Sequence, residues 1–455
     1  MQIYTKGRNY ASKSPINAFF GRRNADCGDY FVSLQTMKNQ ASIDFVRQNR
    51  EGDIRQLALK GAGGKDVDLA WALDQISGWQ TARSKLPQWA ATEGLVYPPH
   101  LSMEQCSSEL TAKYKAEVVE REIKNASPTG EGLEGTLIDL TGGFGVDFSY
   151  MARSFRQAVY VERNPQLCEI ARHNFQMLGL ANAGIVCGDG VEYLESQPSP
   201  NTHHPSPLTI YLDPARRDTH GQKTYAMSDC TPDVVALKDL LLEKASLVMI
   251  KLSPMLDWHK AVEDLGSVSE VHIVSVDNEC KELLMVLRGA VGKNPATGAT
   301  KVRCVNLLSR GGIEEFDFED TGSSAIHSSP IGEVRRGLFL YEPNASLMKA
   351  GCFAELAARF GVHPIAPNSH LFVSESLKED FPGRRFQITA VSSMNRKTLK
   401  EHLCGISKAN IAVRNFPLSV AELRKRLKLA DGGDVYLFAT TTGDKEHLLL
   451  FSKKV

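Results

Sequence analysis

Hydrophobic residues recur every three or four positions along the first part of the chain, from about residue 34 to residue 91. Ile43, Val46 and Ile54 follow this spacing. The spacing is that of an α-helix with one buried face. The pattern predicts a helical N-terminal domain over residues 1–100.

The pattern changes after Pro98, where a helical stretch at about residues 104–125 is followed by short apolar runs that alternate with helical segments. The runs are residues 136–140, 158–161, 183–186, 208–212, 247–250, 271–276 and 283–287. Such alternation is typical of a parallel sheet flanked by helices. It predicts an α/β domain over residues 101–290, with a doubly wound, Rossmann-like sheet of seven strands.

The hydrophobic pattern of the C-terminal part predicts strands and helices in a different order from that of the central domain. The expected strands and helices, in chain order, are a strand at residues 386–391, a helix at 395–403, a strand at 409–413, a helix at 420–429 and strands at 435–440 and 447–451. Gly443 and Asp444 mark a hairpin turn between the last two strands. We expect an α+β domain over residues 381–455, preceded by a connecting α+β region over residues 291–380.

Charge is balanced overall but not locally. The chain has 53 Lys and Arg against 53 Asp and Glu, which excludes a uniformly basic surface for binding nucleic acid. Residues 384–428, however, hold eleven Lys and Arg against two acids. Such a run is either a solvated face or an RNA-binding surface, and we expect Arg424, Lys425 and Arg426 to contact RNA.

The sequence also bears on compartment and metals. It contains no long apolar run for a membrane span and no apolar core of a secretory signal, so we expect a cytoplasmic protein. The nine cysteines form no C-x-x-C pair, and no motif requires a metal. The oligomeric state stays open.

The chemistry of the central domain centres on the run LIDLTGGFGVD at residues 137–147. Its acid ends one expected strand, and its glycines allow the backbone to approach a ligand closely. Further acids end the next three strands, at the sheet edge where open α/β sheets bind ligands. The candidate cofactor-binding residues are Asp139, Thr141, Gly142, Gly143, Gly145, Glu162, Asp189 and Asp213.

This series, within about residues 101–289, resembles the class I S-adenosylmethionine-dependent methyltransferases. The resemblance implies that the glycine loop holds the methionine part of S-adenosylmethionine, that Glu162 binds the ribose and that Asp189 binds the adenine. A nicotinamide-dependent enzyme is the alternative, but the loop DLTGGFG departs from the G-x-G-x-x-G pattern.

Two further resemblances concern the rest of the chain. The segment YPPHLSMEQCSSELTAKYKAEVV is similar to the one preceding the glycine loop in cap-hypermethylating RNA methyltransferases, where a Ser/Thr-rich helix start covers the cofactor. The whole chain, including LYEPNASLMKAG and NIAVRNFPLSVAELRKRLKL, resembles bacterial methyltransferases with a THUMP-like C-terminal domain. This implies a ferredoxin-like region at residues 291–380, a THUMP-like domain at 381–455 and RNA, such as tRNA or rRNA, as the partner.

The target atom stays open between a base nitrogen and a ribose hydroxyl. Base N-methyltransferases carry Asp/Asn-Pro-Pro-aromatic after strand four, whereas this chain has Asp213-Pro214-Ala215-Arg216. Arg216 could stack on a base or hold phosphate, and Arg217 follows it as a further substrate-binding candidate. Carbon-5 methylation is excluded because no cysteine follows strand five.

The run VMIKLSP at strand five resembles ribose 2′-O-methyltransferases, whose Lys-Asp-Lys-Glu tetrad activates a hydroxyl. The matching residues are Lys115, Asp213, Lys251 and Glu282, with Lys113 as a substitute for Lys115. A lysine in such surroundings can serve as a base. The alternative is a purely structural cluster of ion pairs.

The leading hypothesis is therefore a cytoplasmic methyltransferase that acts on RNA. One alternative is an RNA-binding scaffold with an inactive methyltransferase core, and the intact acid series argues against it. The other is a small-molecule methyltransferase, which would leave the basic C-terminal segment unexplained.

Overall fold

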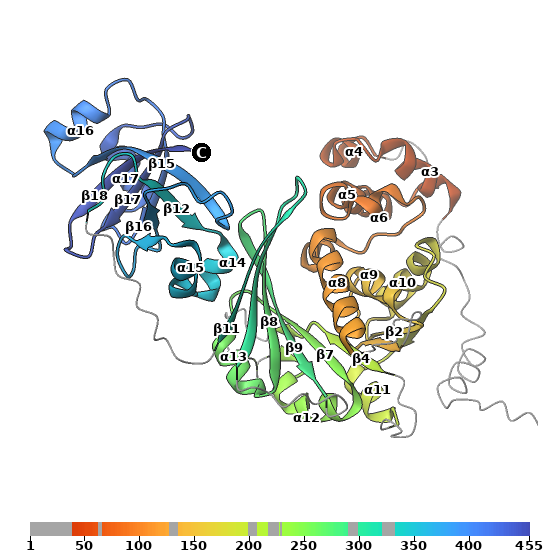
Figure 1. Cartoon of the computed structure of the whole chain (residues 1–455). Coiled ribbons are helices and arrows are strands. Elements are labelled where there is room, and N and C mark those ends of the chain that lie inside the picture. The colour runs from red at the N-terminus through yellow and green to blue at the C-terminus, as the bar shows by residue number, and fades with distance from the viewer. Residues whose placement is uncertain are drawn as a thin grey trace, which may run out of the picture. The chain divides into compact units, whose positions relative to one another are not determined.

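The computed structural model of the 455-residue chain describes residues 39–61, 66–126, 135–198, 207–216, 227, 230–289, 299–320 and 333–455. The chain divides into two compact units, Met1–Leu212 and Asp213–Val455 (Figure 1). The part of the expected helical region before residue 39 lies outside the described residues.

The described residues of the first unit start with helices, as the hydrophobic spacing predicts. They are α3 (Gln40–Asn49), α4 (Ile54–Lys60), α5 (Leu69–Lys85), α6 (Pro87–Ala91) and α7 (His100–Gln105). Asn39, Asp53 and Asp68 each accept a hydrogen bond from a backbone N–H in the first turn of α3, α4 and α5, respectively. These caps explain why three separate helices form where the periodicity alone indicates one helical region.

The same unit contains four parallel strands in the order β4-β1-β2-β3. The strands and the helices between and before them are α8 (Glu109–Ala126), β1 (Thr136–Asp139), α9 (Val146–Met151), β2 (Gln157–Glu162), α10 (Pro165–Met177), β3 (Ala183–Cys187), α11 (Gly190–Ser196) and β4 (Leu208–Leu212). Each strand overlaps a run predicted from the sequence, so this half of the doubly wound sheet is confirmed.

One hydrophobic cluster joins the N-terminal helices to the loop after β1. Phe144 of that loop is 5% exposed and packs against Trp89 of α6, with ring centroids 4.9 Å apart. Tyr97, Met103 and Ala112 belong to the same cluster. The helical region thus supports the glycine loop through packing.

The second unit holds the remaining strands of the domain in the order β11-β10-β8-β9-β7. The elements are β5 (Ala215–Arg216), β6 (Cys230–Thr231), α12 (Val234–Lys244), β7 (Leu247–Leu252), α13 (Trp258–Leu265), β8 (Val268–Val276), β9 (Glu279–Arg288), β10 (Thr300–Leu307) and β11 (Ile313–Asp320). Strands β7, β8 and β9 match the last three predicted runs. The sequence did not predict β10 and β11, which extend the sheet beside β8.

A seven-stranded sheet in the order β13-β14-β12-β15-β18-β17-β16 completes the second unit. Its elements, with the helices that connect them, are β12 (Phe339–Pro343), α14 (Ala345–Ala350), α15 (Phe353–Phe360), β13 (His363–Pro364), β14 (Phe372–Ser374), β15 (Gly383–Ser392), α16 (Arg396–His402), β16 (Asn410–Arg414), α17 (Val420–Leu427), β17 (Tyr436–Thr441) and β18 (His447–Lys454). The elements predicted after residue 381 are confirmed. Leu399 of α16 and Leu423 of α17 share one cluster with Leu449 of β18, so both helices cover the same face of this sheet.

Candidate functional site

The loop between β1 and α9 is built for a close approach of backbone to a ligand. A Cβ on Gly142 would lie 2.2 Å from the ring of Tyr160, so no side chain fits there. Gly145 has φ 83° at the start of α9, a left-handed conformation that favours glycine. Burial raises the pKa of the Tyr160 phenol, which donates a hydrogen bond to the Gly143 carbonyl at 2.5 Å.

Two predicted acids hold this loop in place. Asp139 is 1% exposed, and its Oδ1 accepts a hydrogen bond from the Thr141 N–H at 2.9 Å. At the end of the neighbouring strand β2, Glu162 Oε2 accepts from the Gly143 N–H at 2.8 Å, and its Oε1 accepts from the Asn164 N–H at 2.7 Å. Each Glu162 oxygen therefore has one donor and keeps a second lone pair for a ligand hydroxyl.

The third predicted acid, Asp189, caps helix α11 at the end of β3. Its Oδ1 accepts hydrogen bonds from the Val191 N–H at 2.8 Å and the Glu192 N–H at 3.2 Å. Within the described part of the chain its Oδ2 has no hydrogen bond. Together, the free-standing oxygen of Asp189, the half-used carboxylate of Glu162 and the glycine loop fit the adenosine and methionine parts of S-adenosylmethionine.

A buried polar cluster beside the loop was not predicted from the sequence. Lys115 of α8 is fully buried, and its Nζ lies 3.2 Å from Asp147 Oδ1 and 3.3 Å from Ser107 Oγ. Asp147 Oδ2 accepts hydrogen bonds from Ser107 Oγ at 2.7 Å and from the Tyr211 hydroxyl at 2.8 Å. Asp147 ends the glycine-rich run, but the sequence contains no signal that pairs it with residues 32, 40 or 64 positions away.

Three candidate catalytic residues lie in the second unit. Lys251 Nζ is 2.6 Å from Asp213 Oδ2, and the two side chains are 14% and 40% exposed. Lys251 of β7 is opposite Leu284 of β9, so Glu282, two residues away, lies diagonally beside Lys251 on the same face. Glu282 is 2% exposed. The fourth candidate, Lys115, belongs to the first unit.

The predicted substrate-binding residues near Asp213 are only partly described. Pro214 is buried, and Arg216 pairs with Cys230 in the short β5-β6 ladder. Arg217 lies outside the described residues.

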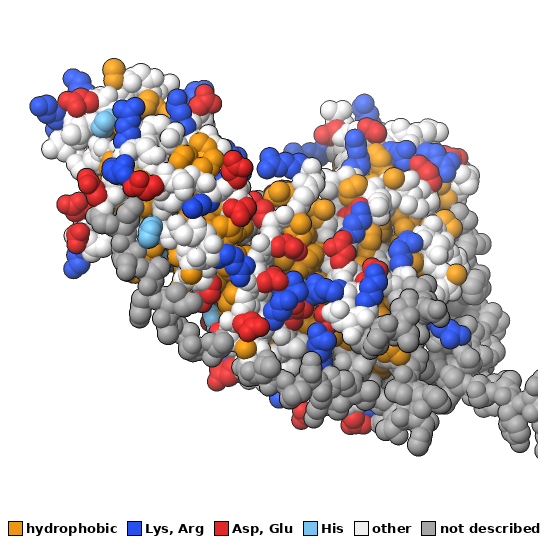
Figure 2. All heavy atoms as spheres, viewed as in Figure 1, with side chains coloured by type: hydrophobic (Ala, Val, Ile, Leu, Met, Phe, Trp, Pro, Cys, Tyr) orange, Lys and Arg blue, Asp and Glu red, His pale blue; other side chains and the backbone are white. Residues whose placement is uncertain are grey.

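The basic C-terminal segment is divided between structural and exposed cations. Arg384 and Arg414 both form ion pairs with the buried Glu342, and Arg424 Nη2 lies 2.5 Å from Asp431. Seven others are exposed and, within the described part of the chain, form no ion pair; they are Arg396, Lys397, Lys400, Lys408, Lys425, Arg426 and Lys428. Figure 2 shows Lys and Arg side chains on the outer surface around α16, with a few acids among them.

The described residues also bear on metals and membranes. In this part of the chain no group of three or more His, Cys, Asp and Glu side chains could hold a metal ion. None of the helices described is both long enough and apolar enough to cross a bilayer.

Comparison with known proteins places the chain in a family. Residues 339–382 match a family of ferredoxin-like domains, and residues 383–453 match a family of THUMP-like domains. No curated protein matches. Among solved structures, the chain is similar to a candidate methyltransferase from Porphyromonas gingivalis W83, with 33% identity and a TM-score of 0.77 over 92% of this chain and 99% of that one.

An S-adenosylmethionine-dependent methyltransferase from Agrobacterium tumefaciens is more distant, with 16% identity and a TM-score of 0.27 over 38% of this chain and 62% of the other. This distant similarity adds nothing to the assignment. The Porphyromonas protein and the domain matches do, because they span nearly the whole chain and its C-terminal part. The chain belongs to the family of class I methyltransferases that carry a C-terminal THUMP-like domain.

Proposed function

We propose that this methyltransferase uses S-adenosylmethionine and acts on RNA. The observation that carries the RNA proposal is the exposed cationic face of α16 and α17 in a chain with no net charge. Arg396, Lys397 and Lys400 extend from α16, and Lys425 and Arg426 extend from α17. Because both helices pack on one face of the sheet, their cations form one surface suited to phosphates.

The cofactor proposal rests on the acids of the first unit. Glu162 would accept hydrogen bonds from the ribose hydroxyls, Asp189 would accept from the adenine amino group, and Asp139 would fix the start of the loop. S-adenosylmethionine supplies an electrophilic methyl group when it is bound. The residues of this chain hold the cofactor and orient the acceptor.

We assign the proton-handling role to Lys251 and its partner Asp213. A ribose hydroxyl or an exocyclic amine must lose a proton on methylation. In its neutral form the Lys251 amine can accept this proton, and the Asp213 carboxylate then stabilises the ammonium that results. Glu282 would orient Lys251 from the adjacent strand. For Lys115, the contacts with Asp147 and Ser107 favour a role in positioning α9 and the glycine loop over a role as the fourth tetrad member.

The test of the function is mass spectrometry of nucleosides from total RNA of strains with and without this protein. We expect one methylated nucleoside to disappear in the strain that lacks it. Loss of a 2′-O-methylated nucleoside supports the role of Lys251, Asp213 and Glu282 in activating a ribose hydroxyl. Loss of a base-methylated nucleoside supports the role of Asp213-Pro214 in binding the methylated base. An unchanged profile over all RNA classes contradicts the RNA proposal and favours an inactive scaffold or a small-molecule substrate.

A purified variant tests the chemistry. Lys251→Met should lower the transfer rate by a factor of about 100 or more and leave cofactor affinity unchanged, because general bases contribute about 10²–10⁴. Lys281→Met is the matched control, since Lys281 lies on the neighbouring strand β9, is exposed and alternates to the opposite face from Glu282. Equal turnover in the two variants would remove Lys251 from the mechanism.

A further inference from the structure

The N-terminal helices form a pocket that the proposed function does not use. Its volume is about 150 Å³, and it lies between α3, α5, residues 92–97 and α10. Its walls include Arg47 of α3, Arg50 directly after that helix, Trp71 and Trp79 of α5, Glu93 and His173. A cavity of this size accepts one aromatic ring system.

The walls of the pocket are anchored by hydrogen bonds. Gln75 uses both ends of its amide, accepting from the Tyr97 N–H at 2.8 Å and donating to the Tyr97 carbonyl at 2.9 Å. His173 Nε2 lies 2.7 Å from the Gly94 carbonyl oxygen, which ties α10 to the 92–97 segment. The segment therefore has fixed contacts to both neighbouring helices.

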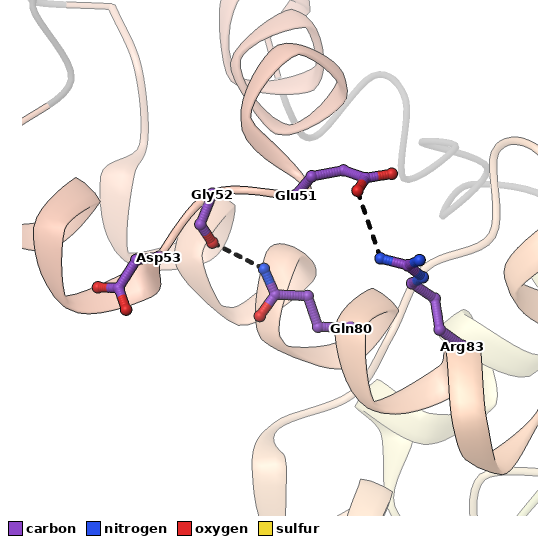
Figure 3. Close-up of a pocket in the computed structure, with 5 residues that line it drawn as sticks. All are labelled: Glu51, Gly52, Asp53, Gln80 and Arg83. Atoms are coloured by element: carbon purple, nitrogen blue, oxygen red, sulfur yellow. Dashed lines mark hydrogen bonds and ion pairs between the residues drawn. The ribbon is translucent and has the colours of Figure 1, made fainter.

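The turn that carries Arg50 is anchored in the same way from the other side of α5. Gln80 donates to the carbonyls of Arg50 at 2.9 Å and Gly52 at 2.8 Å. Figure 3 shows Gln80 pointing to Gly52, and Arg83 pointing to Glu51, with which it pairs at 3.4 Å. These contacts fix the backbone of Arg50, so the pocket wall is formed before a ligand arrives.

The polar groups of the pocket suit a nucleotide. The Arg50 guanidinium lies 4.6 Å from the centre of the Trp79 ring and 3.0 Å from Glu93 Oε1, so its plane is held in place. Within the described part of the chain Glu93 Oε2 accepts no hydrogen bond. Arg47 is exposed at the rim. The pocket thus combines a ring platform in Trp71, a fixed guanidinium, a carboxylate for amino donors and a cation for phosphate.

We propose that this pocket binds one unstacked base of the RNA substrate, a proposal that rests on the RNA function above. Unpaired bases are bound by stacking on aromatic rings or guanidinium planes, with hydrogen bonds to their edges. Glu93 favours guanine, adenine or cytosine, which carry amino donors, over uracil. An aromatic side chain of a protein partner would fill the same volume but would bring no amino donor to Glu93 Oε2 and no phosphate to Arg47.

The experiment titrates the full-length protein, without cofactor, with GMP, AMP, CMP, UMP and ribose 5-phosphate, and follows tryptophan fluorescence. We expect the nucleotides to quench fluorescence, UMP most weakly, and ribose 5-phosphate to have no effect. Trp71→Ala should weaken nucleotide binding about tenfold, since stacking on one aromatic ring contributes about that much. Trp71→Phe keeps a stacking ring and should bind within about threefold of the parent.

Four results would overturn the proposal. The first two are equal effects of ribose 5-phosphate and the nucleotides, and no response to any nucleotide. The other two are equal nucleotide affinities of the Trp71→Ala and Trp71→Phe variants, and equal affinities for UMP and GMP in both the parent protein and the Glu93→Gln variant. Circular dichroism of each variant controls for folding. The readout needs no methyl transfer, so it separates the two proposals. If the protein binds nucleotides but methylates no RNA, the proposed RNA methylation is refuted and base binding in the pocket stands. If it methylates RNA but the pocket does not respond to nucleotides, base binding in the pocket is refuted and the RNA methylation stands.

Discussion

The buried ion pair between Lys115 and Asp147 gives the most direct test of how the glycine loop is held. Asp147 lies in the first turn of α9, directly after the loop, and Lys115 lies on α8 with no exposed surface. We consider Asp147→Asn, Lys115→Met and the double variant. Asp147→Asn leaves a buried ammonium opposite a neutral amide.

The expected costs follow from what each change leaves behind. Removing one partner of a buried ion pair destabilises by about 3–5 kcal/mol. We expect this for Asp147→Asn. Lys115→Met should cost less, about 1–3 kcal/mol, because the Asp147 carboxylate keeps the hydroxyl donors of Ser107 and Tyr211. The double variant should cost no more than Asp147→Asn alone, since it leaves no buried charge opposite a neutral group.

Hydrogen exchange measured by mass spectrometry suits a chain of several domains, because it reports on α8 and α9 separately. A cost of about 3 kcal/mol corresponds to roughly 150-fold faster exchange of their protected amides. Peptides from β17 and β18 provide the internal reference. Lys113→Met is the control on the same helix, because Lys113 is 41% exposed and its ion pair with Glu109 contributes about 0–1 kcal/mol. If the cost of the double variant equals the sum of the two single costs within about 0.5 kcal/mol, the coupling between Lys115 and Asp147 is refuted.

Three further predictions concern the loop and a thiol. Gly142→Ala should destabilise the protein by about 1–3 kcal/mol, because its Cβ would lie 2.2 Å from the Tyr160 ring. Chemical denaturation measures this cost, and calorimetry should show weaker binding of S-adenosylhomocysteine. Unchanged stability and affinity would show that the ring moves freely. Glu162→Gln should weaken cofactor binding more than it affects stability, and equal affinity would exclude Glu162 from the ribose site. Burial raises the pKa of the Cys280 thiol to about 11, so its alkylation rate should increase about tenfold per pH unit up to that value. At pH 8 the exposed Cys404 should therefore be alkylated faster than Cys280, and similar rates would contradict this.

The sequence predicts the central strands because each combines an apolar run with a distinctive end. Strands β1, β2 and β3 end in or beside Asp139, Glu162 and Asp189, and the glycines after β1 are required by the Tyr160 ring and by the left-handed turn into α9. These constraints are local. A single strand and its following turn therefore carry enough information to predict this half of the site.

The features that were missed depend on contacts between distant segments. The edge strand β11 has the sequence IEEFDFED and reads as a polar segment, although Arg303 of β10 neutralises its Asp317 at 2.7 Å. Charged edge strands are common because they resist pairing with other chains. The role of Asp147 likewise depends on α8, whose packing against α9 no spacing in the sequence indicates.

In the basic segment, too, contacts between distant residues change what the sequence indicates. They lower the number of cations that can bind phosphate, and this number determines the salt dependence of RNA binding. Counting along the sequence gives eleven cations between residues 384 and 428, but Glu342 engages Arg384 and Arg414, and Asp431 engages Arg424. Of the other eight, Arg385 is half-buried, and seven are exposed without an ion pair in the described part of the chain. Each phosphate contact contributes about 0.7–0.9 to the slope of log affinity against log salt, so seven contacts limit its magnitude to about 5–6, whereas eleven would allow about 8–10.

A titration of RNA binding against salt separates these two limits. Replacing Lys425 and Arg426 by Gln should lower the slope by about 1.4–1.8, whereas the same change at Lys453 and Lys454, exposed residues at the end of β18, should leave it unaltered. Arg424→Gln should act mainly on stability, because Arg424 also donates to the Ala409 carbonyl at 3.2 Å and is 25% exposed. A parent slope above about 8 would mean that the ion-paired arginines leave their carboxylates to bind RNA, and that the cationic surface is larger than α16 and α17 alone present.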